Sequence, residues 1–418
     1  MSILIKNGTI VNSKKSFLSD IFIENNIIKQ IAPKIDIEAN EIIDAKGLHI
    51  LPGIIDSQVH FRDPGLTHKE DLESGSLAAL HGGVTTFLEM PNTKPSTTTA
   101  ERIAEKVAIA KEKSHTRFGF FLGASADNLD QVKNAHNIEG CCGIKIFLGS
   151  STGDLLLYDE DKLIPIFENA KVPIAVHSEN EVMLKQRKYI QENATDVHAH
   201  YKWRDEQTAF SSTEKILEIA RKTGKKVHIL HISTAQEMQF LEKNKDVCTV
   251  EVTPQHLTLF APECYDELDT FAQMNPPIRE INHLKTLWWG IENKIVDVLG
   301  SDHAPHLIEE KKLGYPKSPS GMPGVQTMLP IMLNHVNNKK LTLNKLVELL
   351  CENPSDLYSL DRGKIQEQKV ADITIIDLNK THIIKNEDMK YKCGWTPFHG
   401  KEIKGKVEKV IIDGKIKL

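Results

Sequence analysis

The stretch LPGIIDSQVHFRDPG, residues 51–65, decides how the rest of the chain is interpreted. It begins as an apolar strand and runs into a polar segment with a nitrogen ligand, His60, and a fixed cation, Arg62, before a Pro-Gly turn. Because side chains alternate along a strand, His60 and Arg62 point the same way. A metal ligand beside an anion-binding arginine suits hydrolysis of a charged substrate. Gln58 shares this direction, although an amide is a poor metal ligand.

Length and composition exclude several classes of protein. The 418 residues are 40% hydrophobic, which is enough for a barrel of about 250 residues and a smaller unit. The net charge of -5 is small and the basic residues are scattered, so we expect neither nucleic acid nor membrane as a partner. We find no signal peptide and no CxxC pair among the six cysteines. We therefore expect a cytoplasmic protein with reduced thiols and a small-molecule substrate.

Apolar strands alternate with loops and amphipathic helices through the middle of the chain. Eight strands are predicted, at residues 53–59, 84–89, 118–123, 143–148, 173–177, 227–231, 249–252 and 296–301. This count predicts an α/β fold, a (β/α)8 TIM barrel over residues 51–360, with its active site at the C-terminal strand ends. A doubly wound sheet fits less well, because no Gly-rich dinucleotide turn follows the first strand.

Both ends of the chain are rich in β-strand patterns. Residues 1–50 and 361–418 alternate short apolar runs with turn signals. Each segment is too short to enclose a core, so we expect the two to assemble one small β-sandwich.

Polar residues lie at the C-terminal ends of the predicted barrel strands. These residues are His60, Lys145, His177, His231 and Asp302. One such histidine is more often a core residue than a ligand, but buried lysine and aspartate are rare unless paired, so the set favours a functional site. Histidine and carboxylate ligands suit zinc and similar ions. A protonated Lys145 cannot ligate; it would serve as a counter-charge or, after reaction with CO2, as a carbamate that bridges two metal ions.

In these motifs the chain resembles the cyclic amidohydrolase superfamily, and within it the dihydroorotases, over most of its length. The motifs are residues 52–65, MPNT at 90–93, GIKIF at 143–147, MNPPIR at 274–279 and SDHAPH at 301–306. The combination of Arg62, Asn92 and Asn275 is more specific to dihydroorotases than to hydantoinase-like relatives.

The resemblance implies reversible cyclisation of N-carbamoyl-L-aspartate to (S)-dihydroorotate by metal-activated hydroxide, in de novo pyrimidine biosynthesis. It implies one or two zinc ions per subunit, a homo-oligomer, possibly a dimer, and Asp302 as the general acid–base. The implied metal ligands are His60, Lys145 in its N6-carboxylated form, His177, His231 and Asp302. The implied substrate-binding residues are Arg62, Asn92, Asn275 and His306.

Gln58 departs from the His-x-His pattern of the family. Because an amide is a weaker zinc ligand than imidazole, the sequence leaves open whether one or two metals bind. Two other interpretations remain: a hydantoinase-like or allantoinase-like enzyme, and an inactive scaffold for aspartate carbamoyltransferase. The retained ligand set argues against the scaffold.

Two long connections are candidates for closing the site. The loop 303–324, rich in Pro and Gly, is expected to be a lid, because loops of this length after a barrel strand are usually functional. The insertion 193–210 is the second candidate. It contains His198 and His200, which lie in a polar region and are not expected to be metal ligands.

Overall fold

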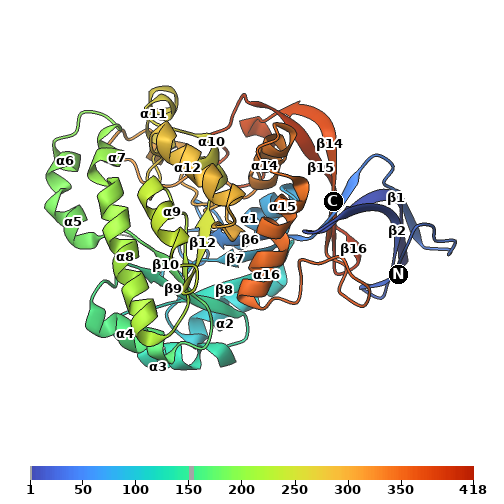
Figure 1. The fold of residues 1–418 in the computed structure, drawn as a ribbon, viewed down its shortest axis with the longest axis horizontal. Coiled ribbons are helices and arrows are strands. Elements are labelled where there is room, and N and C mark those ends of the chain that lie inside the picture. The colour runs from blue at the N-terminus through green and yellow to red at the C-terminus, as the bar shows by residue number, and fades with distance from the viewer. Residues whose placement is uncertain (1, 150–154) are drawn as a thin grey trace.

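The computed structural model describes residues 2–149 and 155–418 (Figure 1). It contains two sheets of eight strands each, one in the barrel and one built from both ends of the chain. No helix in the described ranges is long and apolar enough to cross a membrane.

The barrel strands are parallel, and each pairs with its neighbour in the sequence. They are β6 (Ile54–Val59), β7 (Val84–Glu89), β8 (Arg117–Gly123), β9 (Cys141–Phe147), β10 (Ile174–His177), β11 (Val227–Ile229), β12 (Cys248–Val252) and β13 (Val298–Leu299). A parallel bridge from Val59 to His303 joins the segment after the last strand to the first strand. The predicted barrel and its eight strands are confirmed. Their continuous apolar sequences reflect burial on both faces of a parallel sheet.

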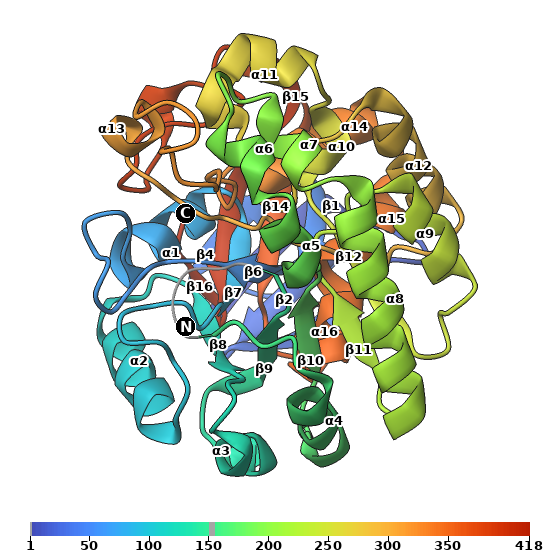
Figure 2. The same cartoon turned by 90° about the vertical axis from the view of Figure 1, so that its left-hand side faces the viewer.

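Helices surround the strands, as Figure 2 shows. The longer ones are α1 (Leu72–His81), α2 (Ala100–Lys113), α4 (Glu160–Asn169), α8 (Glu206–Thr223), α9 (Ala235–Glu242), α12 (Ile281–Glu292) and α14 (Met328–Asn337). The shorter ones are α3 (Leu129–Asn134), α5 (Glu181–Gln186), α6 (Lys188–Glu192), α7 (Ala199–Trp203), α10 (Pro254–Thr258), α11 (Glu263–Leu268), α13 (Ile308–Lys311), α15 (Leu343–Val347) and α16 (Asn353–Tyr358). Helix α8 shows why the boundaries fall where they do. Asp205 accepts a hydrogen bond from the backbone of Thr208 at its start, and Gly224 ends it with a φ of 67°.

The second sheet has the order β16-β15-β14-β5-β1-β2-β3, with β4 paired to β1. Its strands are β1 (Ser2–Val11), β2 (Ser16–Glu24), β3 (Ile27–Ala32), β4 (Glu41–Asp44), β5 (His49–Pro52), β14 (Ile373–Ile383), β15 (Glu402–Ile412) and β16 (Lys415–Ile416). Antiparallel pairing of β5 with β14 joins the two ends of the chain, and Ile10, Ile50 and Ile375 share one core. The expected assembly from both termini is confirmed, while the domain boundaries at residues 50 and 360 stay a prediction.

All six cysteines are free thiols, as expected; five are buried and Cys141 is half-buried.

Candidate active site

A cavity of about 300 Å³ lies at the C-terminal ends of the barrel strands. The structure brings together in its lining all nine predicted site residues, namely His60, Arg62, Asn92, Lys145, His177, His231, Asn275, Asp302 and His306. Gln58 lines it as well, and the loop after β13 supplies part of its wall between Ala304 and Gly321. The geometry therefore supports one site, although the individual roles stay predictions.

Three lining residues have backbones in the left-handed region. The φ angles are 63° at Arg62, 37° at His231 and 43° at Asp302. Such angles are uncommon outside glycine, cost free energy, and concentrate where a side chain must be aimed. Each residue follows a barrel strand, so the strand ends there and its next side chain turns into the cavity.

His60 and Asp302 form one corner of the cavity. His60 Nδ1 lies 2.6 Å from Asn92 Oδ1, and because an amide oxygen can only accept, Nδ1 carries the proton. His60 Nε2 therefore presents a lone pair, yet it faces Asp302 Oδ1 at 3.2 Å. Gln58 Nε2 donates to the same Oδ1 at 3.0 Å, and Gln58 Oε1 has no hydrogen-bond partner among the described residues. Two acceptors turned toward one another call for a cation or a proton between them.

Burial sets the ionisation of this corner. It raises the pKa of Asp302 to about 7, against the opposing effect of Lys145. It also lowers the pKa of His60 well below its usual value, with the Arg62 charge acting in the same direction. A neutral imidazole and a carboxyl group that exchanges protons near neutral pH result.

His177 and His231 form the second corner. His177 Nδ1 lies 3.0 Å from His231 Nε2. The other nitrogen of His177, Nε2, lies 2.8 Å from Glu179 Oε2, and Arg204 pairs with the same carboxylate. Burial alone would raise the pKa of Glu179, but Arg204 and then His177 outweigh it and lower that pKa to about 2. Glu179 is thus ionised and can only accept, so His177 holds its proton on Nε2 and its lone pair on Nδ1.

Lys145 on β9 is 1% exposed, and its Nζ has no hydrogen-bond partner among the described residues. The nitrogen lies 4.5 Å from the centroid of the Phe147 ring. Burial lowers the pKa of Lys145 to about 7, against the opposing charge of Asp302. Its own charge lowers the pKa values of the histidines in both corners. Lys145 therefore lies near both corners. At neutral pH its amine is uncharged in a large fraction of the molecules.

The donor set can be tested for its fit to a metal. In the part of the chain that the structure describes, no three His, Cys, Asp or Glu side chains form a metal-binding group by themselves. Each corner supplies two side chains of types that ligate divalent ions, so a further anionic ligand is needed. A carbamate on Lys145 would supply oxygens near both corners. The site thus fits a divalent ion once Lys145 is carboxylated.

Arg62 lies near the His60–Asp302 corner, since its charge adds to burial in lowering the pKa of His60. It is 6% exposed and forms no salt bridge with any described residue, and its Nε has no hydrogen-bond partner there. Burial lowers its pKa to about 10, so it remains charged at neutral pH. Asn275 Oδ1 in the same cavity also lacks a partner among these residues. A buried guanidinium without a carboxylate partner indicates a binding position for an anion.

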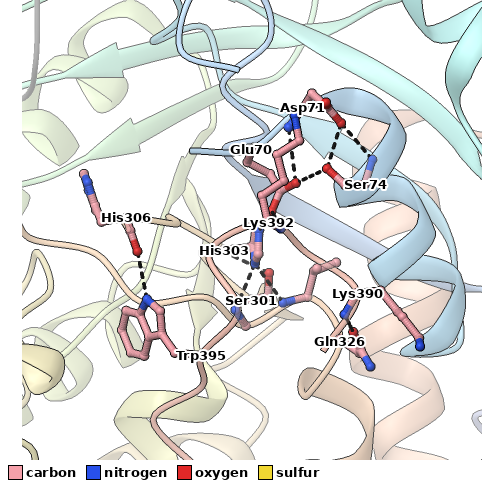
Figure 3. Close-up of polar contacts among 12 residues, drawn as sticks. Glu70, Asp71, Ser74, Ser301, His303, His306, Gln326, Lys390, Lys392 and Trp395 are labelled. Carbon is pink, nitrogen blue, oxygen red and sulfur yellow. Dashed lines mark hydrogen bonds and ion pairs between the residues drawn. The ribbon is translucent and has the colours of Figure 1, made fainter. Parts of the chain in front are cut away.

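His306 is held by groups that the sequence analysis did not include. Lys69 Nζ donates to His306 Nδ1 at 3.1 Å, and His306 Nε2 donates to Ser320 O at 3.1 Å. Trp395 donates from Nε1 to His306 O at 2.8 Å, so a C-terminal segment fixes this loop (Figure 3). Both ring nitrogens are engaged within the protein in this conformation, and substrate binding by His306 stays a prediction.

The segment around Trp395 also supports the loop between β6 and α1. The backbone N–H of Lys392 donates to Glu70 Oε2 at 3.1 Å, and the Lys392 ammonium pairs with Asp71 (Figure 3). His303, next to Asp302, accepts from the Gly324 N–H at 3.0 Å and lies 3.7 Å from Glu70. This network anchors the backbone that carries Asp302.

The insertion 193–210 supplies Trp203 and Arg204 to the cavity wall, and its role in closing the site stays a prediction. His200 is buried and bonds from Nε2 to Met274 O at 2.9 Å, and His198 pairs with Asp266. Neither lines the cavity, in agreement with their exclusion as ligands. Arg204, which follows α7, does line it. Sequence reasoning missed Glu179, although its position two residues after His177, on the same side of a strand end, was a usable signal.

Comparisons with known proteins identify the family of this chain. A model of the amidohydrolase family matches residues 49–417. The dihydroorotase of Methanosarcina mazei is 34% identical, over 95% of this chain and 90% of the relative. The dihydroorotase of Lactococcus lactis is 32% identical, over 100% of this chain and 99% of the relative. Among solved structures, the L-hydantoinase of Arthrobacter aurescens is 27% identical with a TM-score of 0.95, over 99% of this chain and 95% of that one.

Proposed function

Because the chain belongs to the amidohydrolase family, and within it to the dihydroorotases, we propose that its cavity interconverts N-carbamoyl-L-aspartate and (S)-dihydroorotate, in de novo pyrimidine biosynthesis. Arg62 carries this choice of substrate. Both compounds bear a carboxylate that takes no part in ring closure, and Arg62 is a buried cation that has no salt-bridge partner among the described residues. Its planar fork can bind the two carboxylate oxygens together and fix the orientation of the ring.

We further propose that a divalent ion, zinc, is held by His60, His177, His231, Asp302 and a carboxylated Lys145. When bound, the ion would polarise the ring amide carbonyl and provide hydroxide at neutral pH. Carboxylation needs the neutral amine: the Lys145 lone pair attacks CO2, an N–C bond forms, and one proton is released. Burial of Lys145 favours that neutral form.

Asp302 is the proposed general acid–base. In hydrolysis it accepts a proton from the attacking water and delivers it to the leaving ring nitrogen, and in cyclisation the same steps run in reverse. Its position beside His60 and its buried carboxylate suit a group that must be neither permanently charged nor permanently protonated.

A hydantoinase activity is the second candidate, because the overall structure superposes on the L-hydantoinase of Arthrobacter aurescens with a TM-score of 0.95. A hydantoin has no carboxylate for Arg62 to bind.

We also propose, from the family resemblance, a cytoplasmic homo-oligomer.

The test is a spectrophotometric assay of the zinc-loaded protein on dihydroorotate, with hydantoin, allantoin and 5,6-dihydrouracil as competing substrates. We expect turnover of dihydroorotate in both directions and weak turnover of rings without a carboxylate. Preference for hydantoin would favour the second candidate, and no turnover of any ring by zinc-loaded protein would favour an inactive scaffold.

A further inference from the structure

Glu179 lies behind His177 and is fully buried, with 0% exposure. Its Oε2 receives two donors, His177 Nε2 at 2.8 Å and the guanidinium of Arg204. A buried carboxylate is costly unless such donors satisfy it. The position is therefore built around this contact, and Glu179 does not line the cavity.

The contact with Glu179 decides which nitrogen of His177 carries the proton and which presents a lone pair to His231. The carboxylate is paired with the Arg204 guanidinium and accepts from both partners, so the proton of the His177 ring lies on Nε2, the nitrogen that faces Glu179. The lone pair on Nδ1 is then directed at His231 Nε2, 3.0 Å away. Without Glu179 the ring could take the other tautomer, with a proton on Nδ1 that would block this position.

A second arginine holds the first in place. Arg279 donates from one guanidinium nitrogen to Arg204 O at 2.9 Å and from Nε to Ser233 Oγ at 2.9 Å. Ser233 lies two residues after His231. The contacts thus run from His177 through the insertion and back to the loop that carries His231.

We propose that Glu179, held by Arg204, is a positioning residue that fixes the tautomer of His177 and directs its Nδ1 lone pair at the point shared with His231. This inference rests on the proposed function, in which His177 and His231 hold the metal ion. In this inference the insertion 193–210 supplies Arg204. Arg279 of the MNPPIR motif supports both the insertion and the loop that carries His231.

The experiment compares the full-length native protein with Glu179→Gln. Glu237→Gln is the matched control, because Glu237 is also a buried carboxylate of this region but bonds to Thr213 and Thr234. The first measurement is the rate at which cobalt-loaded protein releases Co²⁺ to a chelator. The second is long-range ¹H–¹⁵N correlation NMR of ¹⁵N-histidine-labelled, metal-free protein, which reports the tautomer of His177 once that signal is identified by its loss in His177→Gln.

We expect Glu179→Gln to release Co²⁺ about 10- to 100-fold faster and to show a mixed His177 tautomer, while Glu237→Gln stays within about twofold of the native rate. Equal release rates with an unchanged Nε2–H tautomer would overturn the inference, as would equal acceleration by both variants. If Glu179→Gln does not fold, Arg204→Gln tests the same pair from the other side, with the same expected and contrary results.

The outcome is separable from that of the proposed function. Native protein that is inactive on dihydroorotate, but whose cobalt retention depends on Glu179, would overturn the activity alone. Active native protein whose Glu179→Gln form keeps cobalt and the tautomer would overturn this inference alone. If the native protein retains no cobalt, the NMR measurement decides.

Discussion

His60 Nε2 and Asp302 Oδ1 lie 3.2 Å apart, and the imidazole supplies no proton to this contact, since the His60 proton is on Nδ1 toward Asn92. Two buried acceptors at this distance repel one another in a medium of low dielectric constant. The strand ends, including the left-handed backbone of Asp302, hold them there. This arrangement is stable only with a cation or a proton between the two atoms. The backbone at the strand ends therefore builds a position for a metal ion or a proton.

Replacing Gln58 with His should raise the number of metal ions that each chain holds tightly. The Gln58 amide donates to Asp302 Oδ1 and so competes for that oxygen, whereas an imidazole would add a lone pair. We expect inductively coupled plasma mass spectrometry of dialysed protein to give about one ion per chain for the native protein and about two for Gln58→His. Gln58→Asn should not increase the content. Two firmly held ions in the native protein would contradict the prediction.

Asp302→Asn should abolish turnover in both directions. The amide cannot accept the proton, so kcat should fall by roughly 10²- to 10⁴-fold. Asp297→Asn is the control, because Asp297 lies just before the N-terminal end of the same strand and bonds there to Lys245 and the Val250 N–H. Changes at that end of a barrel affect stability more than catalysis. Near-native rates for Asp302→Asn would refute the acid–base assignment.

Arg62→Met should weaken the use of substrates that carry a carboxylate. Loss of a buried charged contact costs about 3 kcal/mol, so kcat/KM for dihydroorotate should fall about 100-fold. Turnover of 5,6-dihydrouracil, which lacks the carboxylate, should change little.

The same variant should leave the unfolding temperature of the ligand-free protein unchanged or higher, because it removes a buried charge without a described ion-pair partner. Arg221→Met, at an exposed arginine paired with Asp246, provides the control. An equal loss of activity on both rings would argue against a carboxylate-binding role.

Metal uptake should depend on pH through Lys145. Burial lowers its pKa to about 7, so the amine becomes neutral and able to react with CO2 as the pH rises through about 7. At fixed dissolved CO2, the rate of zinc reconstitution of metal-free protein should rise about tenfold from pH 6 to pH 8 and then level off. A lysine with an ordinary pKa would give about a 100-fold rise without a plateau over this range. That second profile would contradict the shifted pKa.

Much of the barrel could be predicted because its signal is local. Alternating apolar strands and amphipathic helices located all eight strands, with errors at their ends. The strand predicted to reach His231 stops at Ile229, and the one predicted to reach residue 301 stops at Leu299. After each of these strands the backbone turns left-handed, at His231 and at Asp302. That conformation is imposed by the packing around the cavity and not by the local backbone preference of the residue.

The sequence by itself determined the fold class and the residues that gather in the cavity, because strand periodicity places successive strand ends at one edge of a parallel barrel. Only the tertiary structure decided what each residue presents there. Glu179 and Arg204 orient His177. The two ring nitrogens of His306 form hydrogen bonds with Lys69 Nζ and Ser320 O. Burial lowers the pKa of Lys145. These properties depend on partners far apart in the chain and on exclusion of water, neither of which leaves a periodic pattern in the sequence.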